Sequence, residues 1–77
     1  KMDFRKKVYE IIGSICGLEV DSQDKSLSDD LGIDSLGMVA LLIELEDSLN
    51  IELKESDMNP LMLKTTEDIV KLVEKYI

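Results

Sequence analysis

Apolar residues recur at helical spacing in three stretches of this chain. The first stretch begins after Asp3, a favourable capping residue, and ends at Gly17, which predicts an amphipathic helix. The second and strongest stretch runs from about Ser35 to Leu49. The third begins at Thr65, where a capping residue is followed three positions later by an acid, and it supplies the apolar face of a last helix. Strand-like alternation is not convincing anywhere in the sequence.

Two apolar stripes run along the predicted helix 35–49. The first has the i, i+4, i+7, i+11 spacing of a core-facing stripe and consists of Met38, Leu42, Leu45 and Leu49, with Val39 beside it. The second consists of the apolar residues Leu36, Ala40 and Ile43, which share their stripe with the charged Asp47. A helix with both stripes has more apolar surface than one core contact needs. Either a further helix covers the second stripe or a partner docks on it, and the pattern leaves both open.

Two connections join the predicted helices. The first, residues 18–34, is rich in Asp, Ser and Gly, and we expect Leu27 and Leu31 to fasten it to the core. Its length is unusual for so small a domain, which is typical of a functional loop. The second combines an irregular stretch, residues 51–56, with a short helical turn over residues 57–63. The pattern therefore predicts an all-α fold, an irregular four-helix bundle of three longer helices and one short helix with a long first loop.

Length and composition indicate one folded domain over residues 1–77. With 44% hydrophobic and 34% charged residues, the chain has the composition of a globular protein rather than of a disordered segment. The aliphatic run 38–43 is far too short to cross a bilayer and no leader-like segment precedes it, so we expect a cytoplasmic protein without membrane insertion. Plausible helix caps near both ends favour a free-standing protein, which we expect to be a monomer.

The residue types argue against catalysis and against a resident metal. The chain has no histidine and a single cysteine, Cys16, which excludes a disulfide within the chain, the usual zinc ligand sets and an imidazole base for a nucleophile. Cys16 is expected to be a buried small hydrophobe. An EF-hand calcium loop starting at Asp21 would have Gln23 and Lys25 where acids are required. We therefore expect a non-catalytic protein without a metal site.

Charge is unevenly distributed along the chain, whose net charge is −8. The first 17 residues hold four basic and two acidic side chains, whereas the remaining 60 hold five basic and fifteen acidic ones. The acidic part argues against nucleic acid or an anionic membrane as a partner and favours basic proteins. The alternative is that the acidic surface only keeps a small domain soluble.

The segment Asp29-Asp30-Leu31-Gly32-Ile33-Asp34-Ser35-Leu36 resembles the D-L-G-x-D-S-L signature of acyl carrier proteins. The order of helix, long loop, helix, short helix and helix fits that family over essentially the whole chain. The resemblance implies that a phosphopantetheinyl transferase esterifies Ser35 with 4′-phosphopantetheine from coenzyme A. The arm then holds an acyl or aminoacyl group as a thioester. By resemblance, Asp34 contacts the transferase and helps to hold its magnesium ion, without forming a standing metal site here.

The proposed attachment point also agrees with helix physics. A phosphodiester on a serine at the mouth of a helix lies near unpaired backbone N–H groups and the positive end of the helix dipole. The competing interpretation is that Asp34 and Ser35 form an ordinary helix cap, and it would prevail for the dipeptide alone. The surrounding signature favours the carrier.

Partner recognition follows from the resemblance only in part. Fatty-acid carriers usually present acids two and five positions after the serine, and here Gly37 and Ala40 stand at those positions. Apolar anchors for the transferase, the loading ligases and the synthases remain at Leu36 and Ile43. The acids expected to meet basic patches on these partners are Glu44, Glu46, Asp47 and Glu55.

The pathway is left open by the residues. The segment Asp34–Leu45 is similar to the corresponding run in D-alanyl carrier proteins and in some specialised carriers, which favours a dedicated carrier over the fatty-acid one. Fatty-acid or specialised synthesis and an aminoacyl pathway are therefore both compatible with the sequence. A different class, an unmodified helical adaptor that binds a partner through Leu36 and Ile43, is also compatible.

Overall fold

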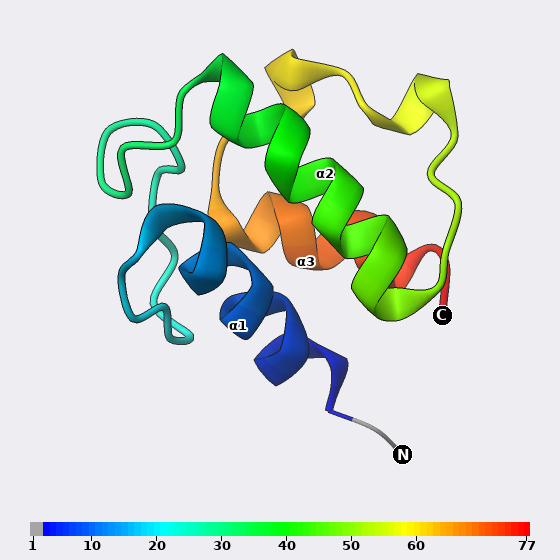
Figure 1. The fold of residues 1–77 in the computed structure, drawn as a ribbon, viewed down its shortest axis with the longest axis horizontal. Coiled ribbons are helices and arrows are strands. Elements are labelled where there is room, and N and C mark those ends of the chain that lie inside the picture. Colours follow the sequence, from blue (N-terminus) through cyan, green and yellow to red (C-terminus); the bar gives the residue numbers. More distant parts are fainter. Residues whose placement is uncertain (1–2) are drawn as a thin grey trace.

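The computed structural model describes residues 3–77, and its regular elements in that range are helices joined by irregular connections, without a strand (Figure 1). In chain order the elements are α1 (Phe4–Cys16), α2 (Ser35–Leu49), two 3-10 helices, η1 (Glu55–Asp57) and η2 (Pro60–Met62), and α3 (Thr66–Glu74). The predicted all-α fold with three longer helices is confirmed. Within residues 3–77, no helix is both long enough and apolar enough to span a membrane.

The short helix predicted over residues 57–63 has a different form in the structure. Two 3-10 helices of three residues each occupy the second connection in place of one α-helix. Pro60 is the first residue of η2 and has no N–H to donate to an earlier turn, so a helix that begins before it is interrupted there. Asn59 caps the new start, since its side chain accepts a hydrogen bond from the backbone N–H of Leu61 at 3.0 Å.

The three α-helices begin and end at residues that the sequence singles out. Asp3 caps α1, and Gly17 ends it in the left-handed conformation with φ 75°. Asn50 ends α2 in the same way with φ 53°. Thr65 and Asp68 form a capping box at the start of α3, in which each side chain accepts a hydrogen bond from the backbone of the other residue. These local interactions explain why the sequence predicted the helix bounds well.

The core lies where α1 packs against both α2 and α3. Its fully enclosed side chains are Val8 and Ile12 of α1, Leu41 and Leu45 of α2, and Ile69, Val70 and Val73 of α3. Burying one such aliphatic side chain contributes about 1.5–3 kcal/mol, so this small set supplies much of the driving force for folding.

The buried face of α2 differs from the predicted one. Leu41 is fully buried although it belongs to neither predicted stripe, whereas Val39, predicted beside the core, is 54% exposed. Of the predicted core stripe only Leu45 is fully buried, while Met38, Leu42 and Leu49 are half-buried. Nine of the fifteen positions of this helix are apolar and those from Met38 to Ile43 are consecutive, so periodicity alone could not choose the face that the neighbouring helices cover.

The first connection, residues 18–34, is fastened to the core as predicted. Leu27 and Leu31 are both buried, and so is Ile33, which the sequence analysis did not include. Cys16 is half-buried rather than buried, because it lies at the last position of α1 and packs against the core only from outside.

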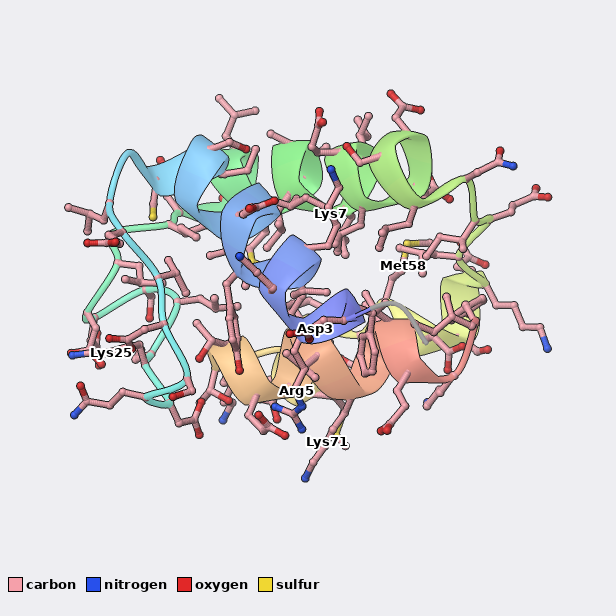
Figure 2. The ribbon with its side chains drawn as sticks, turned by 90° about the horizontal axis from the view of Figure 1, so that it is seen from below. Asp3, Arg5, Lys7, Lys25, Met58 and Lys71 are labelled. Carbon is pink, nitrogen blue, oxygen red and sulfur yellow. The ribbon has the colours of Figure 1, made fainter. Side chains whose placement is uncertain are left out.

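A paired charge holds α1 to the start of α3. Two guanidinium nitrogens of Arg5 donate to the two carboxylate oxygens of Glu67, each at 2.9 Å. Figure 2 shows Arg5 extending from α1 towards α3. The hydrogen bonds from Arg5 keep the pKa of the Glu67 carboxyl below its usual value. Because both side chains are partly exposed, this pair orients α3 more than it stabilises the fold.

Candidate functional site

Ser35 is the first residue of α2, and its side chain is exposed. The cap of this helix is Asp34, whose Oδ1 accepts a hydrogen bond from the backbone N–H of Gly37 at 2.8 Å. The capping role therefore belongs to Asp34 and leaves the Ser35 hydroxyl facing solvent at the mouth of the helix. The interpretation of this site as a helix cap is therefore compatible with its interpretation as an accessible serine.

The chain that leads to Ser35 is held by a compact set of hydrogen bonds. The backbone N–H of Ser26 donates to Asp30 Oδ2 at 2.8 Å, and that of Asp29 donates to Ser26 Oγ at 3.0 Å. The backbone N–H of Ile33 then donates to the carbonyl of Leu27 at 2.8 Å. These bonds, together with the buried side chains of the segment, fix the position of Ser35 relative to the core.

Two glycines shape the backbone on either side of Ser35. Gly32 has φ 68°, a left-handed conformation that favours glycine. A Cβ on Gly37 would lie 3.0 Å from Cγ2 of Ile33 and 3.3 Å from Oδ1 of Asp34. The missing side chain at position 37 therefore lets the Asp34 cap close tightly over the first turn. An acid at this position, where fatty-acid carriers usually have one, would require Ile33 and Asp34 to shift by a few tenths of an ångström.

The first turn of α2 suits an anion on Ser35. The N–H of Gly37 is used by the cap, and that of Met38 bonds to the Asp34 carbonyl at 2.8 Å. The N–H groups of Ser35 and Leu36 precede the first intrahelical bonds and point towards the helix mouth. No acidic residue lies in the first turn itself, so the Asp34 carboxylate at the cap is the acidic group next to this positive end of the helix dipole.

An uncovered apolar surface surrounds Ser35. Leu36 is 78% exposed and Ile43 is 53% exposed, so the interpretation that another helix covers the second stripe of α2 is wrong. Ala40 and Asp47 of the same stripe are exposed as well. The second connection adds Leu61 and Met62, which are 73% and 68% exposed. The sequence analysis missed this pair, although four apolar residues in one short turn, 60–63, indicate that not all of them can be buried.

A cavity of about 340 Å³ lies beside the start of α2. Its lining includes Ile33 and Met38, which flank Ser35 in the sequence, and Pro60 and Leu63 from the second connection. Figure 1 shows η2 next to the first turn of α2, consistent with this shared lining. The polar part of its lining comes from Ser26, Ser28, Asp29 and Lys64. The sequence gave no signal for this cavity, because its two walls are far apart along the chain.

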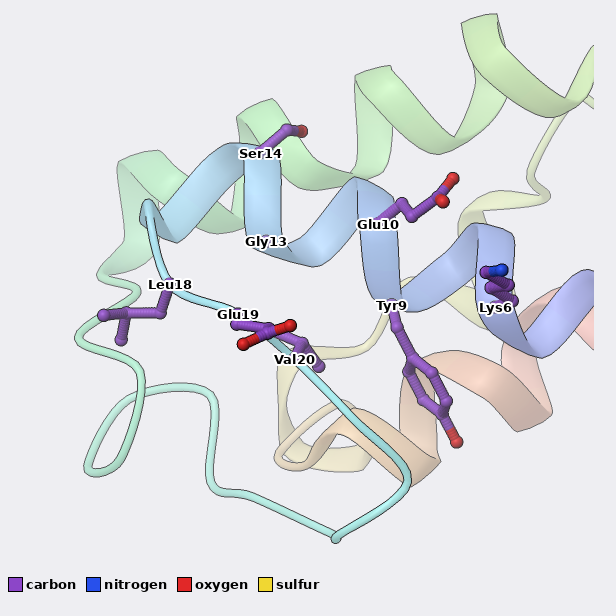
Figure 3. Close-up of a pocket in the computed structure, with 8 residues that line it drawn as sticks. All are labelled: Lys6, Tyr9, Glu10, Gly13, Ser14, Leu18, Glu19 and Val20. Atoms are coloured by element: carbon purple, nitrogen blue, oxygen red, sulfur yellow. The ribbon is translucent and has the colours of Figure 1, made fainter.

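An open hollow of about 440 Å³ lies elsewhere, between α1 and the chain that follows it (Figure 3). It shares no lining residue with the cavity near Ser35. Gly13 explains its shape, because a Cβ there would lie 2.7 Å from the carbonyl oxygen of Leu18. Lys6, Glu10 and Glu19 give the lining charges of both signs, which favours no single class of ligand.

The acids expected at the docking surface have different surroundings. Asp47 and Glu55 are exposed. Glu44 accepts a hydrogen bond from the Ser48 hydroxyl at 2.7 Å. Glu46 accepts one from the backbone N–H of Leu53 at 2.9 Å, which gives Glu46 a structural role in the turn after α2. In the part of the chain that the structure describes, His, Cys, Asp and Glu side chains form no group of three or more that could hold a metal ion.

Comparisons with known proteins agree on one family. The family described as "Phosphopantetheine attachment site" matches residues 6–73. An acyl carrier protein of Chlorobium luteolum is 40% identical over 57 residues, which cover 71% of this chain and 73% of the relative. An acyl carrier protein of Bdellovibrio bacteriovorus is 34% identical over 76 residues, covering 96% of this chain and 95% of the relative.

A mycobacterial relative is similar over most of this chain as well. The meromycolate extension acyl carrier protein of Mycobacterium tuberculosis is 34% identical over 70 residues, which cover 88% of this chain. The match spans only 59% of that relative's length, so the mycobacterial protein contains further sequence outside it.

Proposed function

Because this chain belongs to the family of phosphopantetheine-binding acyl carrier proteins, we propose that Ser35 is the residue that bears its covalent 4′-phosphopantetheine arm. Members of this family are carriers rather than catalysts. The observation that carries the assignment is the exposed position of Ser35 at the mouth of α2, directly after the capping Asp34. The arm supplies a terminal thiol that holds cargo as a thioester, and partner enzymes act on that cargo.

The residues around Ser35 fit the attachment chemistry. A phosphopantetheinyl transferase can reach the exposed hydroxyl, and Asp34 stands beside it for contact with that enzyme. Backbone N–H groups of Ser35 and Leu36 favour the resulting phosphodiester. The firmly held segment 26–33 keeps the attachment point in one position, so that partners meet the arm at a defined place.

Intact-mass measurement tests the attachment site. The unmodified protein is incubated with coenzyme A and a broad-specificity phosphopantetheinyl transferase, and it should gain the mass of one phosphopantetheine. Ser35→Ala should gain none, whereas Ser28→Ala, an equally exposed serine on the preceding connection, should be modified normally. Modification of Ser35→Ala would refute the assignment to Ser35. Failure of the original protein to gain mass would favour the unmodified helical adaptor instead.

The cargo of the arm is proposed to be an acyl group in fatty-acid or specialised synthesis, as the names of the relatives suggest. The alternative is an aminoacyl group in a dedicated pathway, which the similarity of residues 34–45 to D-alanyl carrier proteins favours. Charging the modified protein with candidate adenylating enzymes, followed by mass measurement of the thioester, distinguishes the two. A fatty-acid adduct would support the first assignment, and an amino-acid adduct would support the alternative.

The coenzyme A requirement leads us to propose a cytoplasmic location.

Partner docking is proposed to centre on the apolar residues Leu36 and Ile43, surrounded by acids. Loading ligases and synthases with basic patches would meet the exposed acids Asp47 and Glu55. Because Glu46 bonds to the backbone of Leu53, reversing its charge would disturb the fold as well as docking. The cleaner test is therefore Asp47→Lys together with Glu55→Lys.

The charge-reversed variant should keep its helical circular dichroism and slow arm transfer by the transferase, most strongly at low salt. Leu36→Ala should slow the same reaction at every salt concentration, because its contact is apolar. Unchanged kinetics in both variants would contradict this docking surface.

We propose that the carrier acts as a monomer, which sedimentation at working concentration checks.

A further inference from the structure

The hydroxyl group of Tyr76 connects the end of the chain to the second connection. It accepts a hydrogen bond from the backbone N–H of Lys54 at 2.9 Å and donates one to the carboxylate of Asp57. Lys75 adds an ion pair to the other carboxylate oxygen of Asp57 at 3.0 Å. Lys54 caps η1 and Asp57 ends it, so these contacts hold η1 at both of its ends.

The remainder of the second connection is weakly fastened. Its fully buried side chains, Leu53 and Leu63, lie at its two ends, and between them the half-buried Met58 packs against the core. The other hydrogen bonds of residues 55–62 that the structure describes are short-range, such as Met58 N–H to Glu55 and Met62 N–H to Asn59. Short 3-10 turns have poor hydrogen-bond geometry, so they depend on contacts from outside. For this segment the Tyr76 hydroxyl provides two hydrogen bonds, Lys75 provides an ion pair, and Met58 packs against the core.

The same segment forms one wall of the cavity beside Ser35. Pro60 and Leu63 line it from the second connection, opposite Ile33 and Met38. Of residues 55–62 only Pro60 lines the cavity, since Leu63 follows the segment, so a displacement of the segment would change the width of the cavity through Pro60.

We propose that the Tyr76 hydroxyl is a latch that holds residues 55–62 to the chain after α3, and that its release widens the cavity that Pro60 and Met38 line beside the start of α2. Tyr76 acts as a positioning residue, because it reaches the cavity only through η1 and η2. The exposed Leu61 and Met62 are consistent with a segment that contributes little burial of its own and can open locally. The hydrogen bond from Tyr76, with that from Lys75, keeps the pKa of Asp57 below its ordinary value, so the latch has an ionised acceptor at neutral pH.

Tyr76→Phe tests the latch in the unmodified protein, so the result does not depend on the assignment of Ser35. The substitution removes the hydroxyl and keeps the ring. Tyr9→Phe is the matched control, because the Tyr9 hydroxyl accepts only a 3.3 Å hydrogen bond from Arg5 on the far side of the fold. The measurement is amide hydrogen exchange at residue resolution.

In Tyr76→Phe, exchange at the amides of Lys54, Asp57 and Met58 should accelerate by roughly tenfold or more, the loss expected for hydrogen bonds of which one has a charged acceptor. Exchange in α1 and α2 should stay within about twofold of the original protein, as should all exchange in Tyr9→Phe. Equal acceleration in every helix, or none in the segment, would overturn the latch. If Tyr76→Phe does not fold, Asp57→Asn keeps the tyrosine and should give the same local pattern.

Methionine methyl signals test the connection to the cavity. Met58 lies on the second connection (Figure 2), Met62 ends η2, and Met38 lines the cavity from α2. All three carbon-13 methyl resonances should shift in Tyr76→Phe and not in Tyr9→Phe. A shift confined to Met58 would show that the hydroxyl orders only η1, and the proposed coupling to the cavity would be rejected.

Discussion

Each of the two long connections of this protein is joined to α3, or to the residues just after it, by an aspartate of its own, and the two aspartates bind in different ways. Asp24 binds the start of α3, where its carboxylate accepts from the backbone N–H of Glu67 at 3.0 Å and the hydroxyl of Thr66 at 3.2 Å. Asp57 binds the end of α3 through the side chains of Tyr76 and Lys75. The first aspartate thus uses backbone that the helix itself fixes, whereas the second depends on flexible side chains.

The other contacts of the two connections also differ, since those of the first connection are stronger than those of the second. The first is joined to the chain before α3 by backbone hydrogen bonds from Thr66 to Lys25 and from Leu27 to Lys64, each 2.9 Å long. It also buries Leu27, Leu31 and Ile33 in its second half, whereas the second buries Leu53 and Leu63 at its ends and only half-buries Met58 between them. The comparison teaches that the approach to Ser35 is rigid, while the opposite wall of its cavity is loosely held.

The largest expected effect separates the buried leucines of the two connections. Leu27→Ala should lower the free energy of unfolding by about 2–5 kcal/mol, because Leu27 is 2% exposed in the rigid connection. Leu63→Ala should cost less, since the loosely held segment around it can relax into the space. Urea unfolding of both variants gives the two values. An equal or larger loss for Leu63→Ala would break the comparison.

The next effect isolates backbone strain before Ser35. Gly32→Ala should cost about 1–2 kcal/mol, because Gly32 has φ 68° and no atom crowds its Cβ position. Gly17→Ala is the matched control, with φ 75° and equally open space at the end of α1. Both should lose similar stability in urea unfolding, but only Gly32→Ala should slow arm transfer to Ser35. Equal transfer rates would show that the rigidity of this segment does not matter for modification.

Acid should weaken both ties. Hydrogen bonds keep the pKa values of Asp24 and Asp57 below the ordinary value of 3.8, mainly through the Glu67 backbone for Asp24 and through Tyr76 for Asp57. A lowered folded-state pKa stabilises the fold above the unfolded value, and this contribution disappears as the pH falls through the folded-state pKa. Unfolding midpoints should therefore decrease from about pH 4 downwards. Asp24→Asn and Asp57→Asn should each flatten that decrease, and an unchanged pH profile in both would contradict the assignment.

The smallest effect concerns the exposed partner of Asp57. Lys75→Met removes an ion pair whose lysine side chain is 61% exposed, and solvent screens such pairs. The urea midpoint should stay within experimental error, and the exchange of η1 amides should change far less than in Tyr76→Phe. A large effect of Lys75→Met on either measurement would show that Lys75, and not Tyr76, holds η1 in place.

Local signals made the helix bounds predictable, and they also singled out Ser35 as the proposed attachment point. Asp3, Gly17 and Thr65 act through neighbours a few residues away, so the sequence alone indicated where helices begin and end. The burial of Leu27 and Leu31 was also predicted, because isolated apolar residues in a polar loop are favoured to pack against the core.

Features that depend on distant contacts were not predictable in the same way. The buried face of α2 is set by α1 and α3, so the full burial of Leu41 could not be inferred from a helix whose positions from Met38 to Ile43 are all apolar. The Asp57–Tyr76 hydrogen bond joins residues 19 positions apart, and neither residue stands out by itself. The cavity beside Ser35 likewise exists only once the second connection is folded back.

The crowded space around Gly37 limits how this carrier could be redesigned for new partners. Installing a glutamate there, to imitate fatty-acid carriers, would press its Cβ against Ile33 and bring a negative charge next to the capping carboxylate of Asp34. Gly37→Glu alone would therefore add a charge for partner recognition and at the same time destabilise the start of α2. A successful graft would change Ile33 to alanine at the same time, which removes the crowding Cγ2 atom, so partner preference and loop packing have to be engineered as one unit.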